Sequence, residues 1–189
     1  MMGELLAHLL IKHYVEDLEP ISIYFNKEER SIKKGFDLNF INMEKKAVWY
    51  GEVKSGGVNG DDDCDKANTK LLDKSKKDLQ GFLSGERQNL WHSALIDVGL
   101  TLANEHRTEV KDLLKGDIRE IKSTSDTKKN GVLVSVLFHD IDNKICPLNL
   151  SGYLDSVVEQ GVFQEILAFS IQKNTFRKIR DFLIKDIGK

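Results

Sequence analysis

Three things are scarce in this sequence: cysteine, long apolar runs and net charge. The two cysteines, Cys64 and Cys146, lie far apart, and no C-x-x-C or Cys/His cluster accompanies them. A structural zinc site is therefore not indicated. We expect both residues to be ordinary reduced thiols in a cytosolic protein.

The hydrophobic residues are spread along the chain in short segments. No apolar run approaches the ~20 residues that a membrane-spanning helix needs. The opening residues, MMGELLAHLL, lack the basic region and the cleavage site of a signal peptide. The sequence therefore predicts a cytoplasmic protein with no membrane contact.

Positive and negative charges are nearly equal, with Lys+Arg 28 against Asp+Glu 30 and a formal net charge of -2. This balance argues against a protein that binds nucleic acid through its whole surface, but it allows a local basic patch. The chain has 189 residues and 40% hydrophobic content, which suits one domain over residues 1–189 with a substantial core. No internal repeat or low-complexity stretch is present.

The most informative stretch runs from residue 35 to residue 57 and predicts a β-hairpin. Apolar and aromatic residues dominate residues 36–41 and 47–53, with a polar turn centred on Glu44 and Lys45. If Asp37 opposes Glu52, apolar and polar residues separate onto two faces. One face then carries Phe36, Leu38, Phe40, Trp49, Gly51 and Val53, and the other carries Asp37, Asn39, Tyr50, Glu52 and Lys54. We expect the polar face not to pack on the core.

In this register Asp37, Glu52 and Lys54 point toward one spot. Two carboxylates from neighbouring strands offer oxygen ligands to a hard divalent cation such as Mg²⁺. A lysine beside them can orient a water or offset the charge that builds on a phosphate. The alternative is a solvated strand face, because a lone E-x-K triplet with alternating charge also arises there.

At these residues the sequence resembles the PD-(D/E)xK nuclease superfamily, whose pattern is an acid on one strand and E-x-K on the next. The pattern here is GFD at residues 35–37 and GEVK at residues 51–54, with Phe36 where the family has proline. The sequence is similar, more specifically, to the HamA-type nuclease subunit of Hachiman anti-phage defence systems. That similarity rests on Gly3-Glu4 at the head of an apolar helix, KGFD at residues 34–37 and YGEVK at residues 50–54. HamA-like proteins usually carry more chain before this point, so we expect a compact or truncated member.

The resemblance implies an α/β fold with a restriction-endonuclease-like core. In such a fold a mixed central sheet is flanked by helices, here with a helical insertion before the last core strand. It also implies a Mg²⁺-dependent deoxyribonuclease in antiviral defence, with DNA as substrate and a helicase subunit as partner. By this resemblance Asp37, Glu52 and the carbonyl of Val53 hold Mg²⁺ or Mn²⁺, and Lys54 assists the attacking water. Glu4 supports the metal or, alternatively, only complements the dipole of its helix.

A row of lysines on the predicted helix at residues 64–83 is the candidate nucleic-acid contact. It consists of Lys66, Lys70, Lys74 and Lys77. In the superfamily this helix lies beside the active site, so the row is expected to follow a phosphate backbone; the alternative is a solvated helix face. A competing hypothesis for the whole chain is a catalytically inactive module that binds DNA or a partner protein through this row and the basic C-terminal segment.

The remaining pattern predicts the other elements. Helices are expected at residues 2–14, 88–105 and 109–114, strands at 21–25 and 131–138, a connector at 147–155, and apolar helices after it. Asp61, Asp62 and Asp63 are interpreted as the acidic entry to a helix and not as a calcium loop. His139 and Asp140, at the end of the buried strand, are secondary site candidates.

Overall fold

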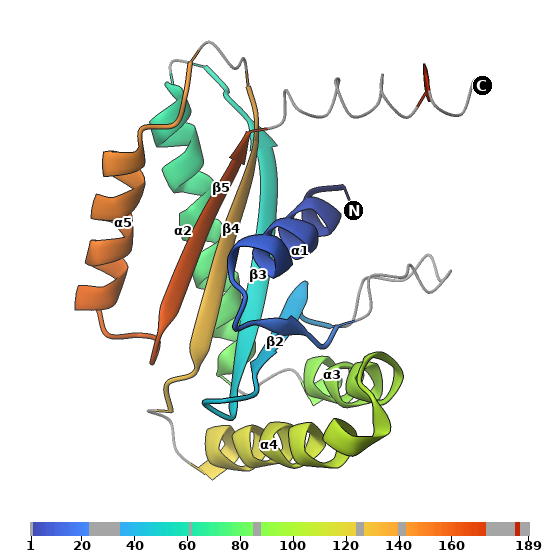
Figure 1. Cartoon of the computed structure of the whole chain (residues 1–189). Coiled ribbons are helices and arrows are strands. Elements are labelled where there is room, and N and C mark those ends of the chain that lie inside the picture. Colours follow the sequence, from blue (N-terminus) through green and yellow to red (C-terminus); the bar gives the residue numbers. More distant parts are fainter. Residues whose placement is uncertain are drawn as a thin grey trace.

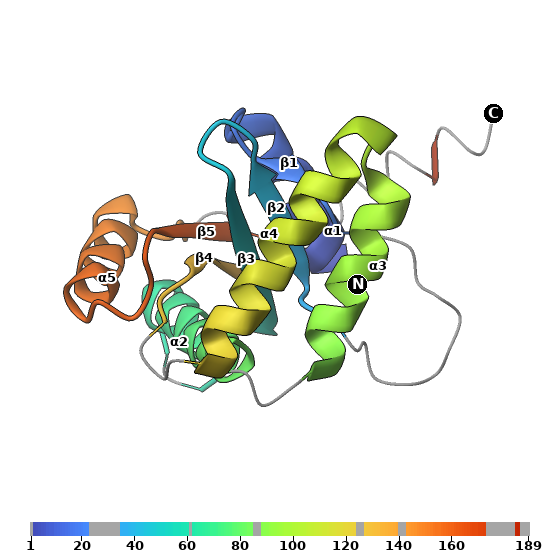
Figure 2. The same ribbon diagram turned by 90° about the horizontal axis from the view of Figure 1, so that it is seen from below.

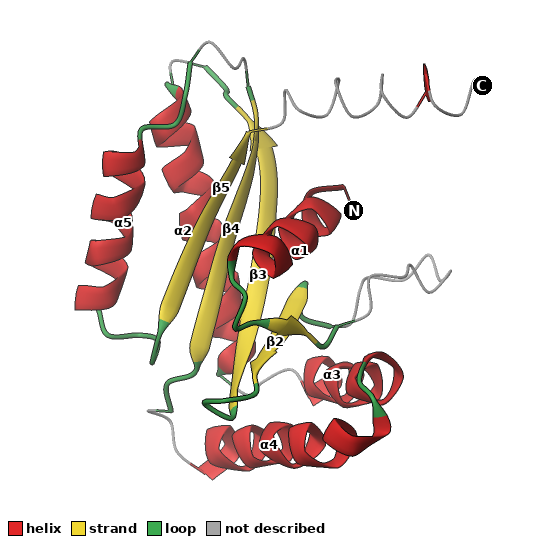
Figure 3. Cartoon of the chain, in the orientation of Figure 1, coloured by secondary structure: helices red, strands yellow, loops and turns green. Residues whose placement is uncertain are grey.

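The computed structural model describes residues 2–22, 35–60, 62–84, 88–123, 127–139, 143–172 and 184–185. Within these ranges the helices and strands alternate along the chain (Figure 3). The elements are α1 (Met2–Tyr14), β1 (Glu19–Pro20), β2 (Leu38–Asn42), β3 (Ala47–Gly57), α2 (Cys64–Leu83), α3 (Gln88–Thr101), α4 (Asn104–Ser123), β4 (Asn130–Phe138), α5 (Pro147–Glu159) and β5 (Ile166–Gln172). None of the helices in these ranges combines the length and the hydropathy that crossing a bilayer requires.

The strands form one mixed sheet in the order β1-β2-β3-β4-β5. Strand β2 is antiparallel to both β1 and β3, whereas β3, β4 and β5 run parallel to one another. Parallel neighbours need long crossover connections. Helices α2, α3 and α4 make the first crossover and α5 makes the second. The α/β class with a mixed, helix-flanked sheet is confirmed.

Helices cover both faces of the sheet (Figure 1). Helix α1 lies on one face, where Ala7 and Ile11 pack against Phe40, Trp49 and Val53. Helix α2 runs along the opposite face, with α5 beside it. Residues 48–53 of β3 are therefore buried, and a polar side chain among them, such as that of Glu52, needs a partner inside the protein.

The hairpin has the register that the sequence predicts. Leu38 pairs with Gly51 and Phe40 with Trp49, which leaves residues 43–46 as the turn. Extending the same register by one residue sets Asp37 opposite Glu52. Gly51 is required here because a Cβ atom on it would lie 2.9 Å from the Cβ of Leu38. The confirmed register is what brings the candidate site together.

The predicted buried strand at residues 131–138 is confirmed as β4. Residues 131–137 are all buried, as expected for a strand with a sheet neighbour on each side and helices on both faces. It is not the last strand of the sheet, however, because β5 follows it and pairs with it in parallel.

Two predictions for the C-terminal part are wrong. Residues 147–155 are the start of helix α5 and not a connector. Pro147 occupies the first helical position, where a missing N–H costs nothing. Residues 166–172 form strand β5 instead of a helix. The spacing of Phe163, Ile166 and Leu167 suits a helix, but the alternation of Leu167, Phe169 and Ile171 suits a strand, and the sheet edge favours the strand.

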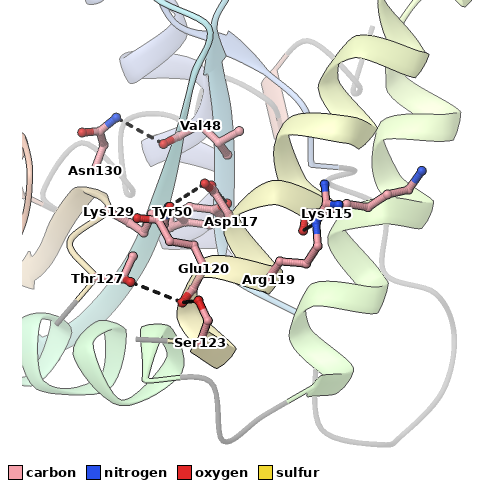
Figure 4. A network of polar contacts seen from close by, with 10 residues as sticks. All are labelled: Val48, Tyr50, Lys115, Asp117, Arg119, Glu120, Ser123, Thr127, Lys129 and Asn130. Carbon is pink, nitrogen blue, oxygen red and sulfur yellow. Dashed lines mark hydrogen bonds and ion pairs between the residues drawn. The ribbon is translucent and has the colours of Figure 1, made fainter. Parts of the chain in front are cut away.

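Helices α3 and α4 form a pair below the hairpin end of the sheet (Figure 2). Helix α4 is longer than the predicted segment at residues 109–114, and α3 is shorter than residues 88–105. A polar network joins α4 to the sheet (Figure 4). The Tyr50 hydroxyl donates to Asp117 at 2.6 Å, and the Lys129 ammonium lies 2.7 Å from Asp117 and 2.5 Å from Glu120.

Other predictions fall on residues that the structure does not describe. They are most of the strand at residues 21–25, Asp61, Asp140 and the basic C-terminal segment from residue 173. The described residues of that predicted strand, Ile21 and Ser22, are not in a strand; they directly follow β1, which pairs with β2.

Candidate active site

Strand β3 supplies two of the candidate residues, Glu52 and Lys54. Their side chains project toward the α2 face, because they alternate along the strand with Val53, which packs on the α1 face. The Lys54 Nζ lies 2.6 Å from the Glu52 Oε1 atom. The two groups thus form an ion pair in which Glu52 is 6% and Lys54 25% exposed at the side chain.

Asp37 lies in a bend just before β2, and its carboxylate reaches the edge of β3. Its Oδ2 atom accepts a hydrogen bond from the backbone N–H of Val53 at 2.9 Å. The N–H and C=O groups of one strand residue leave the strand on the same side. The carbonyl of Val53 is therefore directed toward the side on which Asp37 lies, which places this carbonyl and the Asp37 carboxylate near each other at the beginning of β2.

The prediction that the polar face of the hairpin is not packed on the core is wrong. Tyr50 is 0%, Asn39 2% and Glu52 4% exposed. Phe36 also lies on this face, where its ring contacts those of Tyr50 and Trp91, and not with Leu38 as predicted. The chain bends at residues 35–37, so the strict alternation begins only at Leu38. The polar face is buried because α2 and the α3–α4 pair cover it.

A residue that the sequence does not single out, Asp78, completes the cluster. It lies on α2, and its Oδ2 atom is 2.6 Å from the Lys54 Nζ. One turn earlier on the same helix, the Ser75 hydroxyl donates to the carbonyl oxygen of Glu52 at 2.7 Å. The only signal in the sequence is that Ser75 and Asp78 are three residues apart, which puts them on one helix face. Nothing in the sequence shows that this face meets the E-x-K strand.

The burial of the cluster changes the proton affinity of Glu52. Burial, and next the nearby Asp37 carboxylate, raise the pKa of Glu52 to about 7, although Lys54 opposes the shift. Burial lowers the pKa of Lys54, but its hydrogen bonds to Asp78 and Glu52 outweigh burial and raise it overall. The effect of Asp37 on Glu52 shows that two carboxylates lie close enough to repel each other, which is the situation that a bound cation relieves.

The donor set suits a magnesium-like ion. Across the described ranges, no group of three or more His, Cys, Asp or Glu side chains is placed to hold a metal. Mg²⁺, however, is usually bound by one or two carboxylates, and water or substrate oxygens complete its shell. Asp37, Glu52 and the carbonyl of Val53 would supply such a set. The geometry fits a cation because the hairpin register sets Asp37 opposite Glu52, and the Asp37 carboxylate reaches the Val53 N–H at 2.9 Å.

Glu4 lies in the first turn of α1, on the opposite side of the sheet from the Glu52 side chain. The neighbouring Gly3 approaches β3 closely, because a Cβ on it would lie 2.6 Å from the Oγ of Ser55. Ser55 directly follows Lys54, so Glu4 is near the end of the E-x-K segment. Its part in metal binding stays a prediction.

The four lysines of the row on α2 fall into two pairs. Lys66 and Lys70 contact the Asp62 carboxylate at 3.1 and 2.6 Å. Lys74 and Lys77 are exposed, and Lys74 is one turn from Asp78 on the same side of the helix. The row therefore leads toward the cluster around Lys54, and its last two members lie nearest to that cluster.

Of the secondary candidates, His139 is not part of this cluster, and Asp140 lies outside the described residues. Lys54 is level with Ser135 on β4, so His139 lies roughly 13 Å further along the sheet at about 3.3 Å per residue. Trp91 is a core residue with 4% exposure. It lines a cavity of about 330 Å³ between α3 and α4, together with Asn89, His92, Leu95, Ile118, Ile121 and Lys122.

The mixed, helix-flanked sheet is compatible with a nuclease-like core, and its central hairpin presents an acid, a second acid and a lysine at the spacing of the PD-(D/E)xK pattern. The chain belongs to the HamA family, whose model matches residues 1–187. Membership makes it a nuclease-like protein associated with Hachiman defence. No curated protein and no solved structure matches the chain.

Proposed function

We propose that this protein is a metal-dependent nuclease that hydrolyses DNA phosphodiester bonds in anti-phage defence. The observation that carries the proposal is the convergence of Asp37, Glu52 and Lys54 at one end of the hairpin. The Asp37 carboxylate accepts from the Val53 N–H at 2.9 Å, and the Lys54 Nζ lies 2.6 Å from the Glu52 carboxylate. Burial, and next Asp37, raise the pKa of Glu52. Family membership supports the defence setting.

Each group has a role that follows from its position. Asp37, Glu52 and the carbonyl of Val53 would hold Mg²⁺ or Mn²⁺, which when bound supplies a Lewis acid for the phosphate and lowers the pKa of a coordinated water. Lys54 offers an N–H beyond its two carboxylate contacts, to orient a water or to contact a phosphate oxygen. Burial of Glu52 limits the water around it, which strengthens these electrostatic interactions.

The substrate path is proposed along α2. Lys74 and Lys77 are exposed and lead toward the cluster, so they would contact the DNA backbone first. Lys66 and Lys70 would also contact the DNA backbone once their ion pairs with Asp62 are broken. Because the overall charge of the chain is balanced, a partner would supply much of the affinity for DNA. The partner proposed from the family setting is a helicase subunit.

Plasmid cleavage with purified protein tests the proposal. The wild type should cut DNA with Mg²⁺ or Mn²⁺ and not with EDTA, alone or with the partner subunit added. Glu52→Ala and Lys54→Ala should both abolish cleavage while their circular dichroism spectra stay unchanged. An inert wild type in the presence of partner and metal would refute the nuclease proposal.

One observation favours a second candidate, a catalytically inactive module that binds DNA or a partner protein. Glu52 is only 4% exposed and is already paired with Lys54, as a purely structural ion pair would be. The module would bind through the lysine row and the basic C-terminal segment. It predicts DNA or partner binding that is unchanged by Glu52→Ala.

A further inference from the structure

Lys54 has two carboxylate partners that come from different elements. Its Nζ lies 2.6 Å from the Glu52 Oε1 atom and 2.6 Å from the Asp78 Oδ2 atom. Glu52 belongs to the same strand, whereas Asp78 belongs to helix α2. An ammonium has three N–H donors, so both bonds form at once and one donor remains.

The two partners differ in what a bound cation would do to them. Glu52 is a proposed metal ligand, and a carboxylate oxygen that accepts from an ammonium is a weaker ligand for a second cation. A metal ion would therefore compete with Lys54 for the Oε1 atom of Glu52. Asp78 lies outside the proposed ligand set, and its side chain is 45% exposed against 6% for Glu52. Asp78 can therefore remain paired with the Lys54 ammonium while Glu52 binds the metal.

Helix α2 holds Asp78 in a fixed place relative to β3. The fully buried Ser75 donates to the carbonyl oxygen of Glu52 at 2.7 Å. Ser75 and Asp78 are three residues apart and share a helix face. Leu72 and Leu79, both 0% exposed, anchor the same helix in the core. The carboxylate of Asp78 is therefore carried by a rigid element that already contacts the E-x-K strand.

We propose that Asp78 is a positioning residue for Lys54. It holds the ammonium while a divalent cation occupies the Glu52 carboxylate, so that Lys54 stays beside the site without blocking a ligand. This inference rests on the proposed function. Without Asp78, Lys54 pairs with Glu52 alone. A cation that binds Glu52 must then displace the ammonium, and no second carboxylate is there to hold it.

Calorimetric titration with Mn²⁺ in the absence of DNA tests the inference without relying on activity. Asp78→Asn should weaken Mn²⁺ binding roughly twofold to fivefold, the size of a partly exposed ion pair. Asp78→Ala should act in the same direction. Asp73→Asn is the matched control, because Asp73 is an exposed aspartate on the same helix whose Oδ1 atom accepts from the Tyr153 hydroxyl at 3.2 Å. It should leave the affinity unchanged.

A double-mutant cycle separates positioning from simple attraction between Asp78 and the metal. If Asp78 acts through Lys54, the effect of Asp78→Asn should disappear in a Lys54→Met background. If the carboxylate only attracts the cation, the effect should persist there at its full size. Persistence would overturn the inference.

The same titrations distinguish the inference from the proposed function. Absence of Mn²⁺ binding by the wild type, or binding that Asp37→Asn leaves unchanged, would refute the metal site and the inference with it. Binding that depends on Asp37 but not on Asp78 would refute the inference alone. Circular dichroism and thermal melts of each variant verify that the proteins are folded.

Discussion

The carboxylate of Asp37 accepts a hydrogen bond from the backbone N–H of Val53 at 2.9 Å. The Asp37 side chain thus extends the pairing of the two hairpin strands by one residue beyond β2. It also faces the Glu52 carboxylate. Asparagine at this position can still accept the bond through its side-chain oxygen, but it carries no charge. The two roles can therefore be separated by substitution.

Asp37→Asn should abolish metal-dependent cleavage with little loss of stability. Asp37→Ala should abolish cleavage and also lower the free energy of unfolding by about 1 kcal/mol, because the N–H of Val53 loses its acceptor. Urea unfolding and plasmid cleavage measure the two effects. Equal stability of the two variants would show that the hydrogen bond does not hold the hairpin.

Glu52 should make the stability of the metal-free protein fall as the pH rises. Its folded pKa is about 7, above the ordinary value of 4.5, so between these values the folded protein binds more protons than the unfolded chain. Under that condition stability decreases with pH. Glu52→Gln removes the effect, so its stability relative to wild type should rise from pH 5 to pH 8 by up to roughly 3 kcal/mol.

Denaturant unfolding in EDTA at several pH values measures this difference. Glu159→Gln, which changes an exposed glutamate at the end of α5, is the control and should follow the wild type. A constant difference between Glu52→Gln and wild type over this range would contradict the assignment of a raised pKa.

The two halves of the lysine row should contribute unequally to DNA binding. Lys74→Gln and Lys77→Gln together should weaken binding and reduce the salt dependence of log K by up to roughly 0.9 for each lost phosphate contact. Lys66→Gln and Lys70→Gln should weaken it less, because Asp62 already pairs with both. Asp62→Asn should strengthen binding. Fluorescence anisotropy at several salt concentrations measures all three, and equal effects of the two pairs would show that Asp62 does not mask Lys66 and Lys70.

The hairpin could be predicted from sequence because its information is local. Alternating apolar and polar residues fix the register, and a slip by one residue would exchange the faces, so Leu38 opposite Gly51 follows from the pattern alone. The same pattern gives no information on what covers each face. Tyr50 and Glu52 look like residues of a solvated face, but α2, α3 and α4 bury them.

Asp78 shows the limit on predicting the site. It lies 24 residues after Lys54 in a helix with many charges, and only the packing of α2 on β3 brings it to the ammonium. The position of β5 has the same cause. A short apolar segment with mixed spacing becomes a strand because β4 offers it an edge. Contacts between distant segments decide both cases.

The network that joins α4 to the sheet provides a stability test that is independent of the site. Lys129 is 9% exposed at its side chain and contacts Asp117 and Glu120, while Tyr50 donates to Asp117 at 2.6 Å. Lys129→Met removes the cation between two carboxylates, of which Asp117 is 21% and Glu120 57% exposed, and should lower the free energy of unfolding by about 2 kcal/mol, between the values for exposed and buried ion pairs. Lys115→Met is the control, because the Lys115 ammonium pairs with the exposed Asp112 at 3.0 Å on the solvent face of the same helix, and its loss should cost well under 1 kcal/mol. Urea unfolding measures both. If Lys129→Met were as mild as Lys115→Met, the network would not be what holds α4 against β3, and the apolar contacts of Val110 and Leu114 would suffice.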